Sequence, residues 1–414
     1  MAGAQALKTK RTQTQPVFET NTTNPYGIPI HVGELWTSRQ RQMHPVHYAI
    51  SYRASFKPEL PAFFMDRYLT RRTGRKTPAV VMDPFGGRGT TVLQANLQGH
   101  AAVHNDMNPV AGFIARARGA VPPVERLIER TRQLDLRKRN FRLSERMKSD
   151  LLPFFHPDTL QEILNLRELV LNEADADDEL RYIGMTALSR LYGHSDGFLS
   201  VYTFPQISIM PGAQRRNNER RGQRPEYRDV AARIVRKLKR DLAEPLPPEF
   251  HAASARNRYT TADAREIKAL RSSSVDLIVT SPPFLDKVDY LGDNWMRAWF
   301  LGLEEETRRI ELAVMPEVDR WQSFMREAIL EMGRVLRPGG RAVIEVGEVV
   351  SRKTVTHLEE VMLEFLPLKL RRGRLVAEEV FINQQEFTKL ANCWDVSNNT
   401  KGTNTNRCLV LRKE

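Results

Sequence analysis

Short apolar runs of strand length alternate with helical segments towards both ends of this chain. Residues 79–82 (AVVM) and 101–106 (AAVHND) are two such runs, and the helical stretch TVLQANLQG lies between them. VDLIVT at 275–280 and RAVIEVG at 341–347 continue the pattern, with an amphipathic stretch at 321–340 between them. Strands that alternate with helices are typical of a doubly wound α/β sheet, so we predict a Rossmann-like α/β fold.

The middle of the chain has a different pattern. Between 119 and 255, apolar residues recur at helical spacing and no strand–helix alternation is visible, which predicts a largely helical insert. Residues 1–45 are rich in Thr, Asn and Gln and are predicted to be a flexible N-terminal arm. The α/β domain is then built from residues 46–118 and 256–414, and it closes with an antiparallel pair of strands formed by EEVFINQQ and RCLVLRK.

Basic residues outnumber acidic ones. The chain has 63 Lys and Arg against 50 Asp and Glu, a net charge of +13, and residues 215–240 alone hold eleven basic and three acidic side chains. This excess favours a polyanionic partner. No apolar run reaches membrane-spanning length, which predicts no membrane association and a cytoplasmic location. The two cysteines, Cys393 and Cys408, lack paired-ligand spacing, so we expect neither a disulfide framework nor a metal site.

A glycine-rich turn follows the first strand. Its residues are Asp83, Pro84, Phe85, Gly86, Gly87, Arg88, Gly89, Thr90 and Thr91. Glycines let a backbone approach a ligand closely, and a turn between strand and helix is where doubly wound proteins bind nucleotides. The spacing matches neither a phosphate-binding loop nor a dinucleotide fingerprint. Asp106, at the end of the second strand, can accept hydrogen bonds from both hydroxyls of a ribose.

A second turn, Thr280-Ser281-Pro282-Pro283-Phe284, follows the strand at 275–280. Two prolines fix the backbone, so the Ser281 hydroxyl and the Pro282 carbonyl point in set directions. Phe284 adds a flat apolar ring. Such a turn suits an amino group on a planar base, with the ring stacked on the base and the two oxygens accepting hydrogen bonds from the amine.

Together, DPFGGRGTT and TSPPF resemble the amino-methylating DNA methyltransferases, which modify N4 of cytosine or N6 of adenine. The resemblance covers roughly residues 45–118 and 256–414. It implies a seven-stranded methyltransferase sheet, with S-adenosyl-L-methionine bound at the first turn and the extruded target base at the second. Serine before Pro-Pro is typical of the cytosine-N4 branch. Three looser matches would add cofactor contacts: Phe56-Lys57-Pro58, Asp106, and Asp263 on the adenine amino group.

This resemblance implies direct methyl transfer without a metal or a covalent intermediate, on a base rotated out of double-stranded DNA. The candidate DNA contacts are two groups of side chains: Arg215, Arg216, Arg220, Arg221 and Arg224 in a loop of the insert, and Asn398, Asn399 and Asn404 in a loop between the last two strands. It also implies a bacterial restriction–modification setting with a nucleoid-associated enzyme and a cognate restriction endonuclease as candidate partner. Adenine-N6 methylation, methylation of structural RNA and a catalytically silent DNA-binding module are the alternatives. The oligomeric state and the recognition sequence stay open.

Overall fold

The computed structural model describes residues 19–34, 43–53, 55–69, 78–193, 195–203, 209–283, 292–310, 315, 317–351, 354–384 and 405–414. Its strands are β1 (Glu19–Thr23), β2 (Pro29–Gly33), β3 (Val80–Asp83), β4 (Ala101–Asn105), β5 (Arg258–Thr260), β6 (Val275–Thr280), β7 (Leu336–Val346), β8 (Glu348–Ser351), β9 (Thr354–His357), β10 (Leu368–Lys369), β11 (Arg374–Gln384) and β12 (Thr405–Lys413).

The α-helices are α1 (Glu59–Leu69), α2 (Thr90–Leu97), α3 (Pro109–Gly119), α4 (Val124–Gln133), α5 (Glu145–Leu151), α6 (Pro157–Glu173), α7 (Asp178–Arg190), α8 (Pro211–Arg221), α9 (Val230–Asp241), α10 (Phe250–Ser254), α11 (Trp295–Phe300), α12 (Glu304–Arg309), α13 (Val318–Val335) and α14 (Leu358–Leu363). Two short 3-10 helices, η1 (Pro45–Tyr48) and η2 (Gly292–Asn294), complete the set. None of these helices is long and apolar enough to cross a membrane.

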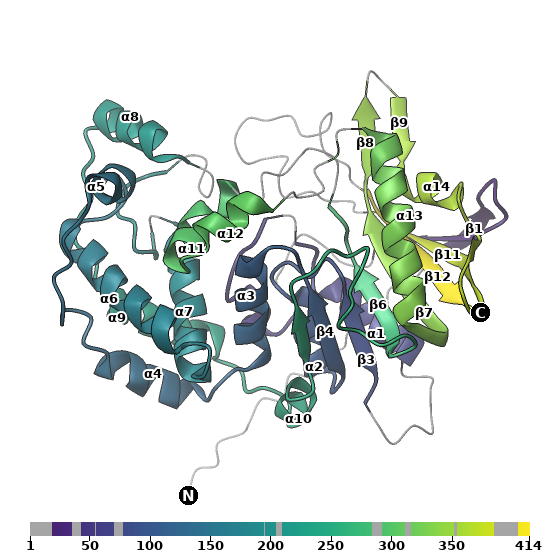
Figure 1. Cartoon of the computed structure of the whole chain (residues 1–414), viewed down its shortest axis with the longest axis horizontal. Helices are drawn as coiled ribbons and strands as arrows, with labels where there is room; N and C mark the ends of the chain where they lie inside the picture. The colour runs from purple at the N-terminus through teal and green to yellow at the C-terminus, as the bar shows by residue number, and fades with distance from the viewer. Residues whose placement is uncertain are drawn as a thin grey trace, which may run out of the picture.

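The central sheet is mostly parallel and confirms the predicted α/β class. Seven of its strands lie in the order β11-β12-β7-β6-β3-β4-β5 (Figure 1). The five strands from β7 to β5 are mutually parallel, and β12 runs antiparallel to both β7 and β11. The last two strands therefore form the antiparallel pair expected from the sequence. The direction in which the chain adds strands reverses between β3 and β6, which makes this the topological switch point of the sheet.

Alternating side chains on the strands give the sheet two apolar faces. Val81 and Leu277 point to one face, where they pack with α1 and α2, whereas Met82 and Ile278 point to the other and pack with α13 and α14. This alternation is the expected consequence of the two-residue repeat of a strand. The result is a three-layer arrangement that holds the carboxyl ends of β3, β4 and β6 along one edge.

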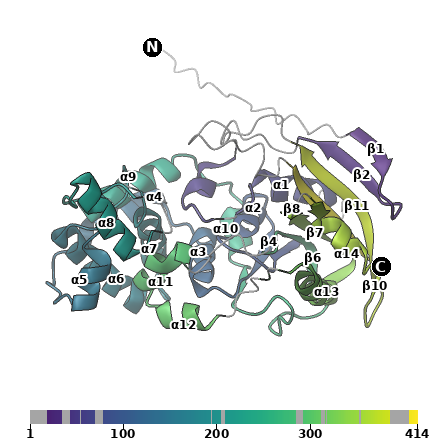
Figure 2. The ribbon, with the colours of Figure 1, turned by 90° about the horizontal axis from the view of Figure 1, so that it is seen from above.

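A helical lobe stands beside the sheet, at the left in Figure 1 and at one end of the molecule in Figure 2. Its helices α4 to α9 share one apolar core with α3 and with the segment around Ile50. Residues Met296, Ala298 and Phe300 of α11 belong to the same core, although the sequence analysis places them in the second α/β segment. Residues 292–309 thus lie in the lobe, because apolar positions of α11 face the insert rather than the sheet.

The N-terminal segment corrects the prediction of a flexible arm for the part that the structure describes. Residues 19–33 form the hairpin β1–β2, and β2 adds to the edge of the sheet by pairing in parallel with β11. His31 stacks on Phe381, with ring centroids 4.7 Å apart, and its Nε2 lies 2.9 Å from the Glu379 carboxylate. The mostly polar sequence of these strands hid them, since backbone pairing and the contacts of His31 hold them together with the packing of only a few apolar residues, Ile28 and Ile30 among them.

Candidate cofactor and target-base site

The two sequence motifs meet at the switch point of the sheet. The glycine turn follows β3 and the Ser-Pro-Pro turn follows β6, its direct neighbour. Thr280 Oγ1 donates to Asp83 Oδ1 at 2.6 Å, and Thr91 Oγ1 donates to the Val279 carbonyl at 3.0 Å. The turns are therefore joined by hydrogen bonds between buried groups, at the place where open α/β sheets bind their ligands.

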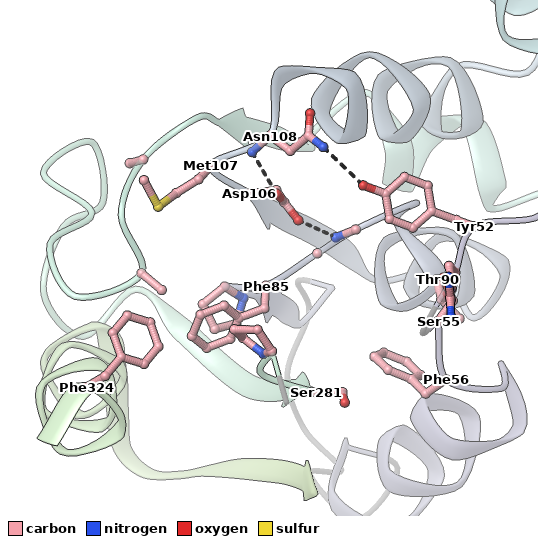
Figure 3. Close-up of a pocket in the computed structure, with 17 residues that line it drawn as sticks. Tyr52, Ser55, Phe56, Phe85, Thr90, Asp106, Met107, Asn108, Ser281 and Phe324 are labelled. Atoms are coloured by element: carbon pink, nitrogen blue, oxygen red, sulfur yellow. Dashed lines mark hydrogen bonds between the residues drawn. The ribbon is translucent and has the colours of Figure 1, made fainter. Parts of the chain in front are cut away.

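A cleft opens over these turns (Figure 3). It encloses about 900 Å³ of empty space, a volume that includes the part open to solvent. Its lining combines the glycine turn and the second turn with residues from four other segments: Tyr52, Arg53, Ser55, Phe56, Pro84, Phe85, Gly86, Gly87, Thr90, Asp106, Met107, Asn108, Ala262, Ala264, Ser281, Pro283 and Phe324.

Asp106 lies at the centre of the hydrogen bonds in the cleft. Its Oδ2 accepts from the Gly87 N–H at 2.7 Å and its Oδ1 from the Asn108 N–H at 2.8 Å, while the Asn108 amide donates to the Tyr52 hydroxyl at 3.3 Å (Figure 3). Each carboxylate oxygen accepts one backbone N–H and has lone pairs left for a ligand hydroxyl. The end of β4 is thereby fixed against the glycine turn.

Two of the glycines are required by close packing beneath the turn. A Cβ on Gly86 would lie 2.3 Å from Cδ2 of the buried His104, and one on Gly89 would lie 3.0 Å from the Ala115 side chain. Gly89 also has φ +76°, a backbone conformation that favours glycine. The glycines therefore allow the turn to lie directly on β4 and α3, and Gly87, with φ +47°, lines the cleft itself.

Asp83 lies below the cleft rather than in its wall. Burial raises the pKa of its carboxyl to about 7, against the opposing effect of hydrogen bonds from the Thr280 hydroxyl and the Phe85 N–H. Its position indicates a structural part in joining the two turns.

Ser281 connects the cleft to a buried carboxylate that the sequence analysis missed. Its hydroxyl hydrogen-bonds to Glu345, near the end of β7, which also accepts from the Asn406 amide of β12. Glu345 is 3% exposed, and burial raises its pKa above the ordinary range although both hydrogen bonds oppose the rise. The Pro283 carbonyl accepts from the buried indole of Trp321 at 3.0 Å. The Ser281 side chain and the Pro283 backbone of this turn are thus each hydrogen-bonded to a buried side chain.

The remaining predicted cofactor residues fall in different places. Phe56 lines the cleft, whereas Lys57 and Pro58 do not; the Lys57 carbonyl caps the first turn of α1. Asp263 lies between two lining residues, Ala262 and Ala264, but its carboxylate binds the Arg265 guanidinium, with a shortest distance of 2.7 Å. A contact between Asp263 and a ligand would require this ion pair to open. Phe284, Asn398, Asn399 and Asn404 lie outside the described residues.

The five arginines predicted to contact DNA are exposed, but four of them lie in a helix instead of the predicted loop. Arg215, Arg216, Arg220 and Arg221 belong to α8, which ends at Gly222 in a left-handed conformation, and only Arg224 follows the helix. In the part of the chain that the structure describes, none of the five is ion-paired to a carboxylate. Arg221 instead contacts a neutral ring, with its guanidinium carbon 4.2 Å from the centre of Tyr202.

One cluster in the described part of the chain has the atoms for a metal site: His357, Glu359 and Glu360. Its most buried member, Glu359, is already ion-paired with Arg407 at 2.5 Å. We therefore assign no metal to it.

No family model matches the chain, and no curated protein matches it. Among solved structures, the chain is similar to a "Putative DNA Modification Methylase" from Thermus thermophilus, with 25% identity, 37% of this chain and 52% of that chain covered, and a TM-score of 0.21. The same protein with S-adenosyl-L-methionine gives the same identity and TM-score. The rRNA methyltransferase aviRa from Streptomyces viridochromogenes is 12% identical over 91% of this chain and 96% of that chain, with a TM-score of 0.31.

The chain thus spans about half the length of the Thermus protein that it matches. All these TM-scores lie below 0.5, so the likeness carries no weight for activity or substrate.

Proposed function

We propose that this protein is an S-adenosylmethionine-dependent DNA methyltransferase that modifies the N4 amine of cytosine. The observation that carries the proposal is the meeting of the glycine turn and the Ser-Pro-Pro turn in one cleft, which Gly87, Asp106 and Ser281 all line. A donor site and an acceptor site that share one wall are what a direct transfer between two bound molecules needs.

The cleft residues fit S-adenosylmethionine. Asp106 is placed to accept from the ribose hydroxyls, and Phe85, Phe324 and Met107 offer apolar surface for the adenine. Gly87 allows the backbone to approach the ligand where a side chain would intrude. When bound, this cofactor supplies an electrophilic methyl group on a sulfonium sulfur.

The residues on the other side fit an exocyclic amine. Because the Ser281 O–H donates to Glu345, the lone pairs of Ser281 Oγ remain to accept an N–H of the amine. An amine that has gained a methyl group carries a positive charge, so one of its protons would have to leave. We infer that this proton passes to Ser281 Oγ while the serine proton passes to Glu345, whose raised pKa suits it to hold a proton.

This inference predicts the pH dependence of Glu345→Gln. In the wild type, kcat at saturating cofactor and DNA should fall as the pH drops through the raised pKa of Glu345, because the protonated carboxyl cannot accept a proton. Glu345→Gln should lose this acid limb and lower the plateau of kcat by roughly 10²–10⁴-fold.

Saturating cofactor is essential to this measurement, since Asp83, with a pKa of about 7, also titrates in the glycine turn and would alter cofactor affinity. An acid limb of kcat that is unchanged in Glu345→Gln would exclude Glu345 as the proton acceptor.

The four arginines of α8 and Arg224 after it support a polyanionic substrate, since all five are exposed and lack carboxylate partners among the described residues. We propose that they neutralise phosphates of the duplex. Each such contact releases counterions and contributes about 0.9 to the slope of log affinity against log salt. The double variant Arg216→Gln with Arg220→Gln should therefore reduce the magnitude of that slope by about 1.8 in fluorescence-anisotropy titrations with a DNA duplex.

The matched control is Arg258→Gln with Arg271→Gln, which removes two exposed arginines at the amino ends of β5 and β6, the opposite edge of the sheet. If both double variants changed the slope equally, the effect would reflect net charge alone and α8 would not be a DNA contact.

The chemical identity of the product tests the proposed function directly. DNA methylated by the purified protein, digested to nucleosides and separated by mass, should contain N4-methylcytosine. N6-methyladenine in its place would move the protein to the adenine branch, and labelled methyl groups in transfer or ribosomal RNA but not in duplex DNA would reject a DNA substrate. Resistance of the methylated DNA to a nuclease that cuts the same sequence when unmethylated would support a restriction endonuclease partner.

A further inference from the structure

A small polar annex adjoins one end of the cleft. It shares Tyr52 and Arg53 with the cleft, and its other walls come from the residue before them and from the segment around η2. The annex is lined by Ser51, Tyr52, Arg53, Asp293, Asn294 and Arg297. Every one of these side chains is polar, and they include both signs of charge, which distinguishes the annex from the cleft itself.

An ion pair closes the annex. Arg53 Nη1 donates to both carboxylate oxygens of Asp293, at 3.2 and 2.9 Å. The Asp293 side chain is 2% exposed and that of Arg53 is 46% exposed, so the carboxylate is fixed in the protein and the guanidinium lies at the opening. Since a guanidinium carries five N–H donors, the two bonds from one nitrogen do not use up its capacity.

Arg297 fixes the floor of the annex. Its buried guanidinium donates to Asn294 Oδ1 at 2.7 Å and to the Ser51 carbonyl at 2.8 Å, and it lies 5.9 Å from the centre of the Tyr52 ring. These contacts join the 51–53 segment to the start of α11. The two walls of the annex therefore keep a fixed spacing, which is a condition for recognising a small ligand group.

The cleft has chemically different ends. Met107 and Phe324 lie on one side of it, and Tyr52 and Phe56 lie on the other (Figure 3). Ala262 and Ala264 also line the cleft, whereas Arg53 is the single cation among the described residues that line it. A ligand with a flat apolar ring at one end and charged groups at the other would place the charged groups at Arg53 and the annex.

We propose that the annex binds the zwitterionic amino-acid head group of the methyl donor, with its α-carboxylate on Arg53 and its α-ammonium on Asp293. This assignment rests on the proposed function. The Nε and Nη2 edge of the guanidinium is the fork that matches a carboxylate, and Asp293 has further lone pairs for an ammonium. Arg53 thus offers a positive charge to the α-carboxylate, and Asp293 offers a negative charge to the α-ammonium.

The proposal gives the helical lobe a part in cofactor binding. Asp293 and Asn294 belong to η2, directly before α11, whose apolar residues are packed in the core of the lobe. Arg53 and Tyr52 belong to the segment that leads to α1 on the sheet. A bound head group would therefore contact both parts of the molecule.

Two ligands that share the adenosyl thioether, one with and one without the amino-acid chain, test this assignment by calorimetry. S-adenosylhomocysteine carries the α-carboxylate and α-ammonium, and 5′-methylthioadenosine lacks both. Arg53→Ala should weaken the binding of S-adenosylhomocysteine roughly 10- to 100-fold, because a charged hydrogen-bonded pair is lost, and leave that of 5′-methylthioadenosine unchanged. Asp293→Asn should show the same selectivity.

The matched control, Arg271→Ala, removes an exposed arginine at the opposite edge of the sheet and should change neither affinity. Unchanged binding of 5′-methylthioadenosine shows that each variant keeps a folded cleft. Loss of both ligands in equal proportion, or wild-type affinity of Arg53→Ala for S-adenosylhomocysteine, would overturn the annex assignment alone. Failure of both ligands to bind the wild-type protein would instead overturn the proposed function.

Discussion

Ser281→Ala should lower kcat for DNA methylation roughly 10²–10³-fold, the usual cost of removing one preorganised polar contact from a reacting group. The variant removes the acceptor for the amine N–H and also a hydrogen bond to the buried Glu345. The serine does not reach the groups that hold the ribose, so the dissociation constant of S-adenosylhomocysteine should stay close to that of the wild type. Single-turnover methylation and calorimetry measure the two quantities separately.

Ser254→Ala is the matched control, because this hydroxyl donates to the local carbonyl of His251 within α10 and does not line the cleft. It should leave both constants unchanged. A Ser281→Ala enzyme that kept the wild-type kcat would show that the amine is bound elsewhere, and our placement of the target base would be wrong.

Asp106→Ala should weaken the binding of the cofactor product, whereas Ser281→Ala should leave that binding unchanged. The variant removes the carboxylate that accepts from Gly87 and Asn108 and that we assign to the ribose hydroxyls. We expect the affinity for S-adenosylhomocysteine to fall by at least roughly 10- to 150-fold, the effect of losing one hydrogen bond to a charged group, which contributes about 1.5–3 kcal/mol. The calorimetric dissociation constant is the measurement that decides this.

Asp319→Ala, which removes an exposed carboxylate near the start of α13, controls for the change in net charge. If Asp106→Ala bound S-adenosylhomocysteine as tightly as this control, the ribose would not lie at the end of β4.

The sheet could be predicted because its signals are local. The strands 79–82, 101–106 and 275–280 are continuous apolar runs with turns at their ends, and the structure has strands β3, β4 and β6 there. It could also be predicted from the sequence that the two turns lie at the same edge of the sheet, since parallel strands have their carboxyl ends along one edge. Whether the residues of these turns bind the ligands assigned to them remains a prediction.

The parts that the sequence did not reveal depend on distant partners. Arg53 meets Asp293 across 240 positions of the chain, and neither lies in a motif. In the sequence, Glu345 is one residue of a predicted strand and belongs to no motif. A carboxylate in an otherwise apolar stretch of strand was nevertheless a usable signal for a polar contact, because a buried charge requires partners. The arginines of α8 were placed in a loop because Asn217, Asn218 and Gly222 suggested one, whereas the helix continues to Arg221.

The pairing of β2 with β11 has a consequence for how this protein is made. Ile30 lies opposite Val380, about 350 residues away along the chain. During synthesis the β1–β2 hairpin leaves the ribosome long before β11 does, so the edge of β2 that pairs with β11 stays in water until those later residues have been made. This non-local pairing can therefore form only late, after the strands between the two segments have been synthesised.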